Sequence, residues 1–113
     1  MCWAMIAVAI LYPRTGATRF DFDYYLNKHM RRSVELLGPA MQTISIERGV
    51  DPPAPWPASS YFAICRFVCD SREAYEAAFL PHADELQGDV RNYTDATPII
   101  QVSELFPLQE RRV

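Results

Sequence analysis

Residues 2–13 read CWAMIAVAILYP, and this stretch decides the fold. Successive side chains of a strand point to opposite faces, so a run that is apolar at every position has two apolar faces. A strand of this kind is buried on both sides. Residues 2–12 are therefore predicted to form a central strand, which ends at Pro13. Its two alternating sets are Trp3, Met5, Ala7, Ala9 and Leu11, and Ala4, Ile6, Val8, Ile10 and Tyr12.

A second stretch has the same character. Residues 61–69 read YFAICRFVC and are apolar on both alternating sets except at Arg66, which predicts a second central strand. In residues 40–48, by contrast, Ile44 and Ile46 alternate with polar residues, as is typical of an edge strand with one face in water. Residues 98–106, PIIQVSELF, form the last predicted strand.

Two helices and one long loop connect these strands. The loop covers residues 49–60, GVDPPAPWPASS, whose four prolines are compatible with neither a helix nor a ladder. Asp21 is the expected N-cap of the first helix, and Asp70 is that of the second, with Glu73 placed to complete a capping box. The second helix should run to about Leu86 with an interruption at Pro81. The first should end at Gly38-Pro39 and bury Phe22, Leu26, Met30 or His29, Val34 and Leu37.

The resulting order, β-α-β-β-α-β, predicts an α+β fold: a ferredoxin-like domain over residues 1–113, with one four-stranded antiparallel sheet. Right-handed crossovers place the first and third strands in the centre. Two helices cover only one face of such a sheet, so we expect the other face to expose a continuous apolar patch. A homodimer in which a second sheet covers this patch is the expected assembly.

Charge and cysteine usage narrow the class of protein further. The net charge of −3 is spread along the chain, and the pairs Arg31-Arg32 and Arg111-Arg112 are too short to attract nucleic acid. The apolar N-terminal stretch falls short of the roughly 20 residues of a membrane helix and lacks a basic leader, so no membrane partner is expected. Three cysteines cannot all pair, and Cys65 and Cys69 would lie roughly 13 Å apart on one strand. Free thiols point to the cytoplasm.

His29 is the first candidate for chemistry. It follows Tyr25 by four residues, so both side chains lie on the helix face that looks toward the sheet. Two interpretations stay open: a packed histidine whose nitrogens are satisfied by neighbours, or a general base that faces a pocket and is oriented by Tyr24 or Tyr25.

The remaining polar residues give weaker signals. His82 is expected to cap a helix end or lie on the surface, and Asn92, Tyr93 and Asp95 share one loop whose composition also suits a turn. The two histidines match no metal motif, and the four glycines form no phosphate loop or dinucleotide fingerprint. We therefore expect no metal and no cofactor.

Several segments together resemble the EthD family over residues 5–106. They are LYP at 11–13, FDFDYYLNKHM at 20–30, LLGPA at 36–40, ERG at 47–49 and GDVRNYTD at 88–95. The resemblance implies a dimeric α/β barrel and a pocket that is lined by Tyr12, Tyr25, His29, Asn92 and Tyr93. Two features depart from the family pattern and would reshape the pocket mouth: Arg31-Arg32 after the histidine, and the long proline-rich insert around Trp56.

Two functions follow as expectations. The first is a cytoplasmic homodimer that binds a small, largely apolar or aromatic metabolite. There, His29 and Tyr25 would catalyse a cofactor-independent oxygenation, isomerisation or dehydration, and Tyr12, Asn92 and Tyr93 would bind the substrate. The second is a non-catalytic accessory or carrier protein for an oxygenase system. Fold likeness alone does not decide between them.

Overall fold

The computed structural model describes residues 5–109. It contains one four-stranded antiparallel sheet built from β1 (Met5–Pro13), β2 (Thr43–Arg48), β3 (Tyr61–Cys69) and β4 (Ile99–Leu105), in the order β2-β3-β1-β4. The two stretches that are apolar on both faces are therefore the central strands, as predicted. Residues 2–4 of the predicted first strand, including Cys2, and the pair Arg111-Arg112 lie outside the described range.

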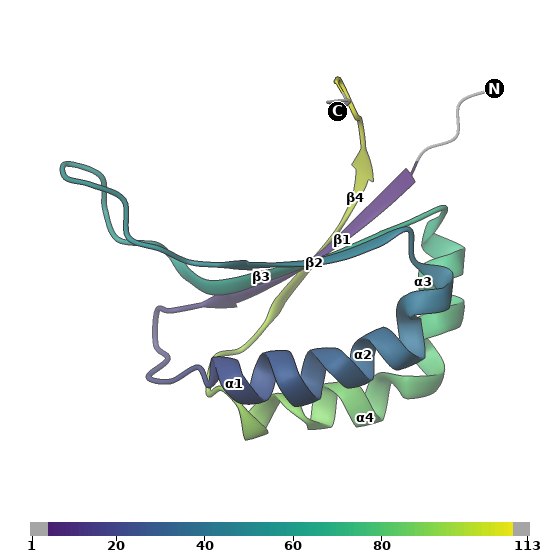
Figure 1. Cartoon of the computed structure of the whole chain (residues 1–113), viewed down its shortest axis with the longest axis horizontal. Coiled ribbons are helices and arrows are strands. Elements are labelled where there is room, and N and C mark those ends of the chain that lie inside the picture. Colours follow the sequence, from purple (N-terminus) through teal and green to yellow (C-terminus); the bar gives the residue numbers. More distant parts are fainter. Residues whose placement is uncertain (1–4, 110–113) are drawn as a thin grey trace.

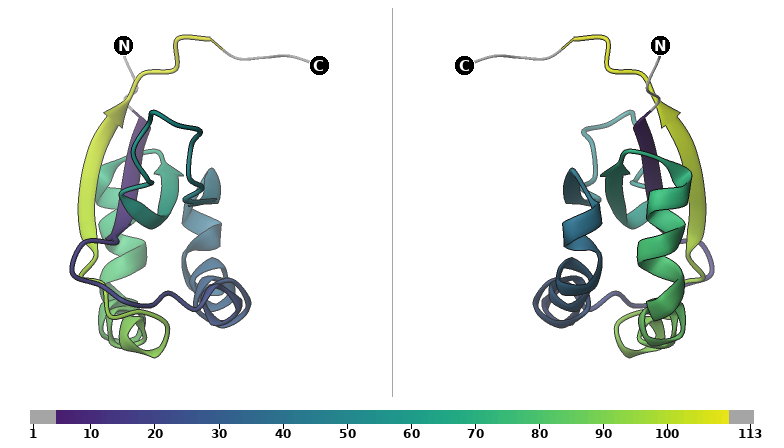
Figure 2. Two further views of the ribbon diagram at one scale, coloured as in Figure 1. Left: turned by 90° about the vertical axis from the view of Figure 1, so that its left-hand side faces the viewer. Right: turned by 90° about the vertical axis from the view of Figure 1, so that its right-hand side faces the viewer.

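All helices lie on one side of this sheet (Figures 1 and 2). The first helical segment consists of α1 (Phe22–Tyr24), the π-helical turn η1 (Tyr25–His29), α2 (Met30–Leu37) and the 3₁₀ turn η2 (Gly38–Ala40). The second consists of α3 (Arg72–Phe79), the 3₁₀ turn η3 (Leu80–His82) and α4 (Ala83–Gly88), followed by the 3₁₀ turn η4 (Val90–Asn92). This is the predicted ferredoxin-like βαββαβ arrangement.

The helix termini confirm one predicted cap and correct the other. The Asp21 carboxylate accepts a hydrogen bond from the Tyr24 backbone N–H (3.1 Å). The second helix is capped by Ser71 rather than by Asp70: the Ser71 hydroxyl accepts from the Ala74 N–H (3.0 Å), and Asp70 instead accepts from the Gln42 side chain. The cap lies one residue later because the backbone of Ser71 is the extended residue that precedes the helix.

The buried stripe of the first helix also differs from the prediction. Leu26 and Val34 are each 48% exposed, and the positions that pack on the sheet are Tyr25, His29, Met30, Ser33 and Leu37. The π-turn explains part of this shift, because the backbone N–H of Met30 bonds the carbonyl of Tyr25, five residues back instead of four. Tyr25 and His29, four positions apart, share the buried face of this turn.

The hydrophobic core lies between these helices and the facing side of the sheet. Val8 at its centre is fully buried and stands opposite Phe67 of β3 and Val102 of β4. The second helical segment adds Tyr75 and Leu86, and its interruption at Pro81 turns α4 back across the sheet. The core therefore contains several tyrosines, whose hydroxyl groups need partners when they are buried.

No helix formed by residues 5–109 covers the back face of the sheet, and cross-strand neighbours form rows on it. One row is apolar across three strands, where it consists of Ile64, Leu11 and Ile99, and it ends at Glu47 of β2. In the next row, Ala9 stands between Arg66 and Gln101, and Arg66 donates to Glu47 of β2 (2.7 Å). The prediction of a continuous apolar patch is therefore wrong in detail. The patch is interrupted because the side chains of Arg66 and Gln101 flank the small Ala9.

The proline-rich segment 49–60 forms the long connection between β2 and β3, as predicted, and extends beyond the helix layer in Figure 1. Its base is closed by a hydrogen bond from the Gly49 N–H to the Phe62 carbonyl (2.9 Å). Trp56 near its tip is 68% exposed. Within residues 5–109, no helix has the length and apolar character needed to cross a membrane.

Candidate functional site

A partly open internal cavity of about 60 Å³ lies between the helices and the sheet. Strands β1 and β3 contribute its floor, and the two helical segments contribute its walls. His29 and Tyr12 are part of the lining, which is otherwise mostly apolar. The complete lining is Ile10, Tyr12, His29, Met30, Ser33, Leu37, Cys65, Phe67, Tyr75, Phe79, Leu86, Gln87, Val90, Pro98 and Ile100.

The cavity is adjacent to a surface depression of about 480 Å³ at the start of β4. The two hollows share the lining residues Gln87, Val90, Pro98 and Ile100. The depression is more polar, because Arg91, Thr94, Asp95 and Thr97 line it. A cavity of about 60 Å³ holds several waters but is smaller than the roughly 150 Å³ apolar cavity known to take benzene. A larger ligand would therefore extend from the cavity into the depression.

The His29 side chain is almost completely buried, with 8% of its surface exposed, and it is held by Asp89. Its Nδ1 lies 2.9 Å from Oδ2 of Asp89, which follows α4. The ring stacks on Tyr25 with 5.7 Å between ring centroids and 15° between planes, and it packs against Tyr93 at 4.7 Å. The ring contacts with Tyr25 and Tyr93 and the contact of Nδ1 with Asp89 together fix the orientation of the imidazole.

Asp89 is itself fixed by two donors. The hydroxyl of Tyr24 donates to its Oδ1 (2.6 Å), and so does the side-chain amide of Asn92 (2.8 Å). Burial raises the pKa of Asp89, but the hydrogen bonds from Tyr24, Asn92 and His29 together outweigh burial and hold that pKa below its ordinary value. The carboxylate is therefore ionised at neutral pH.

Burial lowers the pKa of His29, and the neighbouring Asp89 carboxylate opposes this shift only in part. The imidazole is therefore neutral at pH 7, with one nitrogen able to accept a proton. A neutral imidazole next to an ionised carboxylate is an arrangement that suits general acid/base chemistry.

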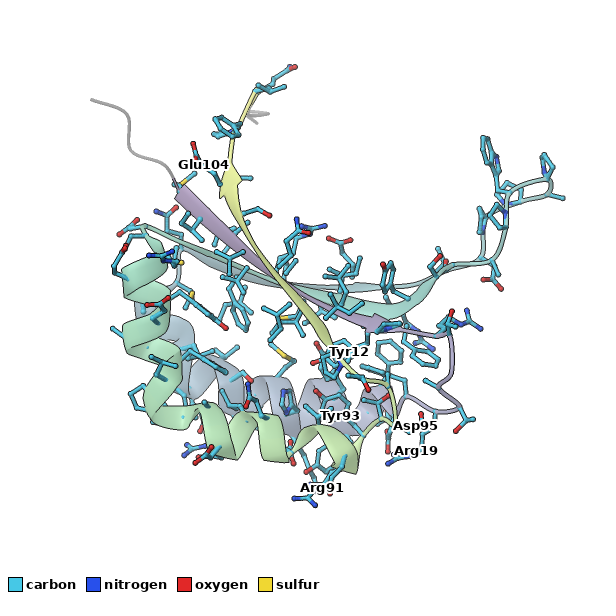
Figure 3. All side chains as sticks on the ribbon, turned by 180° about the vertical axis from the view of Figure 1, so that it is seen from behind. Tyr12, Arg19, Arg91, Tyr93, Asp95 and Glu104 are labelled. Carbon is cyan, nitrogen blue, oxygen red and sulfur yellow. The ribbon has the colours of Figure 1, made fainter. Side chains whose placement is uncertain are left out.

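A cluster of tyrosines surrounds the histidine. The hydroxyl groups of Tyr12 and Tyr93 are hydrogen bonded at 2.8 Å, and Figure 3 shows the two residues side by side between β1 and the helix layer. Burial raises the pKa of Tyr12 to about 12 and raises the pKa values of Tyr25 and Tyr93 further. All three phenols therefore stay protonated near neutral pH.

Tyr25 differs from the other two. It is fully buried, its ring packs edge-to-face on Tyr12 at 5.5 Å, and its hydroxyl has no hydrogen-bond partner among residues 5–109.

The nearby Cys65 lines the cavity, and burial raises the pKa of its thiol to about 12, so it is not a nucleophile at neutral pH. Cys65 and Cys69 are both free thiols.

The structure brings four of the five predicted site residues into direct contact. Tyr12, Tyr25, His29 and Tyr93 form one packed cluster, of which Tyr12 and His29 reach the cavity. Asn92 is exposed and lies behind Asp89, outside the cavity lining. Asp95 also points away from the cluster: its carboxylate accepts from the backbone N–H groups of Thr18 and Arg19 and fixes the loop before α1.

Sequence reasoning missed Asp89. The residue lies 60 positions after His29, in the GDVRNYTD segment, and it precedes Asn92 by three positions as in an ordinary turn. Only the packing of α4 beside the first helical segment brings it to the imidazole. Among residues 5–109, no group of three or more histidine, cysteine or acidic side chains is placed to bind a metal ion.

Comparisons with known proteins identify the family of this chain. The EthD domain matches residues 14–97, which is most of the chain. The crystal structure of an EthD-like protein from Ralstonia eutropha is 38% identical, covers 98% of this chain and 100% of its own, and superposes with a TM-score of 0.85. The chain belongs to the EthD family. No sequence among the curated proteins matches it significantly.

More distant structures share the fold. An ethyl tert-butyl ether degradation (EthD) family protein from Bacillus halodurans is 16% identical over 90% of this chain and 99% of its own, with a TM-score of 0.63. A variant of SnoaB, a cofactor-independent oxygenase from Streptomyces nogalater, is 15% identical over 96% of this chain and 100% of its own, with a TM-score of 0.58. These two likenesses establish the ferredoxin-like architecture of this EthD protein and nothing finer.

Proposed function

We propose that this EthD protein binds a small, largely apolar or aromatic metabolite that carries an oxygen atom, and that His29 acts on it as a general acid/base. The observation that carries the proposal is the position of the imidazole. It is buried, held by Asp89 through Nδ1, and part of the lining of an apolar cavity. A base in such a place can act on a ligand that is shielded from bulk water, so that water does not compete as proton donor or acceptor.

The proposed step is a proton transfer. The free nitrogen of His29 takes a proton from an O–H or from a C–H next to a carbonyl, and the bonding electrons remain on the ligand as a phenolate or enolate. Its oxygen accepts a hydrogen bond from Tyr12, whose own oxygen accepts from Tyr93. Return of the proton from His29 to another atom completes an isomerisation. In a dehydration, the enolate instead expels a hydroxyl group from the β carbon, which takes the proton from His29 and leaves as water. Reaction of the anion with dioxygen would begin an oxygenation.

Tyr25 and Asn92 support this site in the proposal. The Tyr25 ring fixes the plane of the imidazole, and its unpartnered hydroxyl adds a buried donor beside Tyr12. Asn92 acts on the ligand through Asp89, whose carboxylate it holds. The ligand enters from the depression at the start of β4, where Arg91 and Thr97 contact its polar end.

We further propose that the protein works as a homodimer in the cytoplasm. None of the helices in the described part of the chain covers the back face of the sheet, and the apolar row of Ile64, Leu11 and Ile99 on that face is suited to packing against a second sheet. The free thiols of Cys65 and Cys69 suit a reducing compartment.

The test is a turnover assay on a panel of quinols, phenols and lactones, followed by absorbance and by dioxygen uptake. His29→Ala should lower turnover on the order of 10²- to 10⁴-fold, while His82→Ala, which changes the other histidine, should leave turnover unchanged. Turnover by wild type should fall as the pH drops below the lowered pKa of His29, because the protonated ring is no longer a base. Full turnover by His29→Ala would show that the base assignment is wrong.

The alternative of a carrier for an oxygenase system has its own outcome. If no compound in the panel is turned over, but compounds bind wild type and His29→Ala with the same affinity in calorimetric titrations, the chain is a binding protein. The observation that supports this alternative function is the mostly apolar lining of the cavity.

A further inference from the structure

His29 stands in the wall between two hollows. On one side is the internal cavity, and on the other is an outer groove of about 230 Å³ between the two helical segments. His29 and Leu86 line both. Asp89 belongs to the outer groove, and its side chain keeps 23% of its surface exposed. The carboxylate therefore approaches the imidazole from the outer side, away from the cavity.

The hydrogen bonds around Asp89 decide which of its oxygens faces the histidine. Oδ1 accepts from both the Tyr24 hydroxyl and the Asn92 amide, which leaves Oδ2 for Nδ1 of His29. An ionised carboxylate only accepts, so the hydrogen of the 2.9 Å contact is on Nδ1. Nε2 then carries the lone pair. It forms no hydrogen bond within residues 5–109. In that range, Tyr25 Oη is the only side-chain oxygen or nitrogen that is both fully buried and without a hydrogen-bond partner, so Nε2 keeps some exposed surface.

We propose that Asp89 is a positioning residue that holds His29 in the Nδ1–H tautomer and turns the lone pair of Nε2 toward the cavity. In this role Asp89 does not touch the ligand. It selects the nitrogen that takes the proton and stabilises the imidazolium that forms when Nε2 is protonated. The catalytic consequence rests on the proposed function of His29, whereas the tautomer can be measured without any ligand.

Of the charged and titratable groups around the ring, Asp89 is the carboxylate that forms a hydrogen bond to it. In the outer groove, Glu85 is paired with Arg32 (2.6 Å) and makes no hydrogen bond to the histidine. The other groups that face the ring from the elements packed around it are Tyr25 from its own turn, Tyr93 from the segment after η4, Tyr12 and Cys65 across the cavity, and Tyr24 and Lys28 in the groove. None of these is a carboxylate.

The substitution Asp89→Asn tests the proposal because the neighbours favour one orientation of the introduced amide. Tyr24 and Asn92 both donate to the Oδ1 position, so these two hydrogen bonds stay unchanged when the single oxygen of the introduced amide lies there. Its NH₂ group then faces Nδ1, which has to accept, and the imidazole proton moves to Nε2. The site keeps its shape but loses the lone pair on the cavity side.

The measurement is ¹⁵N NMR of the histidine rings in the full-length protein at pH 8. Wild type and the matched control Glu85→Gln should show the Nδ1–H tautomer at His29, and Asp89→Asn should show the Nε2–H tautomer. The spectrum of wild type alone is decisive even if the variant does not fold: an Nε2–H tautomer there overturns the proposal.

Turnover separates this inference from the proposed function. With a compound that wild type converts, Asp89→Asn should lose activity on the order of 10²-fold or more, whereas Glu85→Gln should lose none. If the tautomer switches but turnover is unchanged, the positioning role of Asp89 stands and the acid/base function of His29 is wrong.

Discussion

The hydroxyl oxygens of Tyr12 and Tyr93 lie 2.8 Å apart, although 81 residues separate them in the chain. One side chain comes from the central strand β1 and the other from the segment after η4, so their hydrogen bond connects the sheet to the end of the second helical segment. Both residues are almost fully buried. Removal of either hydroxyl group would therefore leave the other one buried without this hydrogen-bond partner.

Removal of either hydroxyl should destabilise the fold. We expect Tyr12→Phe and Tyr93→Phe each to lower the free energy of unfolding by about 1–3 kcal/mol, because each leaves a buried hydroxyl without a partner. The double variant should cost less than the sum of the two, since it removes both groups. Urea denaturation of the three variants forms the double-mutant cycle that measures this. Strictly additive losses would contradict a direct interaction.

Tyr25→Phe should behave in the opposite way. The Tyr25 hydroxyl is buried without a partner among residues 5–109, so its loss removes a desolvated group and breaks no hydrogen bond. We expect the free energy of unfolding to stay the same or to rise by about 1 kcal/mol. Tyr93→Phe, which removes the same atom from an equally buried ring, is the matched control. A loss for Tyr25→Phe as large as that for Tyr93→Phe would mean that its hydroxyl is satisfied.

Stability should fall between pH 8 and pH 5 because of His29. Burial lowers the pKa of His29 from 6.5 in the folded chain, so the unfolded chain binds this proton more tightly. Stability is then lost as the pH drops through 6.5, and the loss stops below the folded pKa. The pKa of Asp89 is also lowered, from 3.8, so its contribution is lost only at more acidic pH.

The check is urea denaturation at several pH values in this window. His29→Gln should flatten the decline, while His82→Gln should leave it as steep as in wild type. An unchanged slope in His29→Gln would assign the pH dependence to other groups.

Gly49 should tolerate no side chain. A Cβ atom built there lies 2.2 Å from the backbone carbonyl oxygen of Tyr61, and the same backbone donates to the Phe62 carbonyl (2.9 Å). We expect Gly49→Ala to cost about 2 kcal/mol or more in thermal or urea unfolding. Gly88→Ala is the control: no atom lies within 4 Å of its Cβ, and alanine favours the helix by up to about 1 kcal/mol. Equal effects would contradict the close approach.

The proposed dimer predicts a mass of two chains in solution, each of 12.9 kDa. Leu11→Glu places a charge in the apolar row of the back face and should give a single-chain mass in light scattering coupled to size-exclusion chromatography. Val34→Glu, on the exposed side of α2, should leave the mass unchanged. A wild type that is monomeric at micromolar concentration, or a dimeric Leu11→Glu, would contradict this interface.

The fold was largely predictable because its decisive signals are local. Strands β1 and β3 show two apolar faces in a few consecutive residues, and the prolines of segment 49–60 exclude other structures there. The cap at Ser71 was less accessible, because Asp70 is an equally good capping residue one position earlier. Leu26 and Val34 misled the prediction of the buried helix face because tyrosine, histidine and serine occupy the positions that aliphatic residues usually take.

The candidate site was predictable only in part. His29 and Tyr25 lie in one helical turn, where spacing places them together. Tyr12 and Tyr93 came from the family resemblance, because no local pattern relates residues so far apart. Asp89 carried no signal of its own: its role depends on how two helical segments pack, and on two donors that leave one oxygen for the imidazole.

The π-turn from Tyr25 to His29 makes the site dependent on an irregular backbone. An α-helix advances about 100° per residue, so removing one residue from this turn to regularise it would rotate everything on one side of the deletion by that angle. Either Tyr25 would leave the tyrosine cluster or His29 would leave Asp89. A redesign that makes the first helix regular for greater thermal resistance would therefore have to preserve this one-residue insertion. Without it, the product would be a more stable protein that lacks the histidine site.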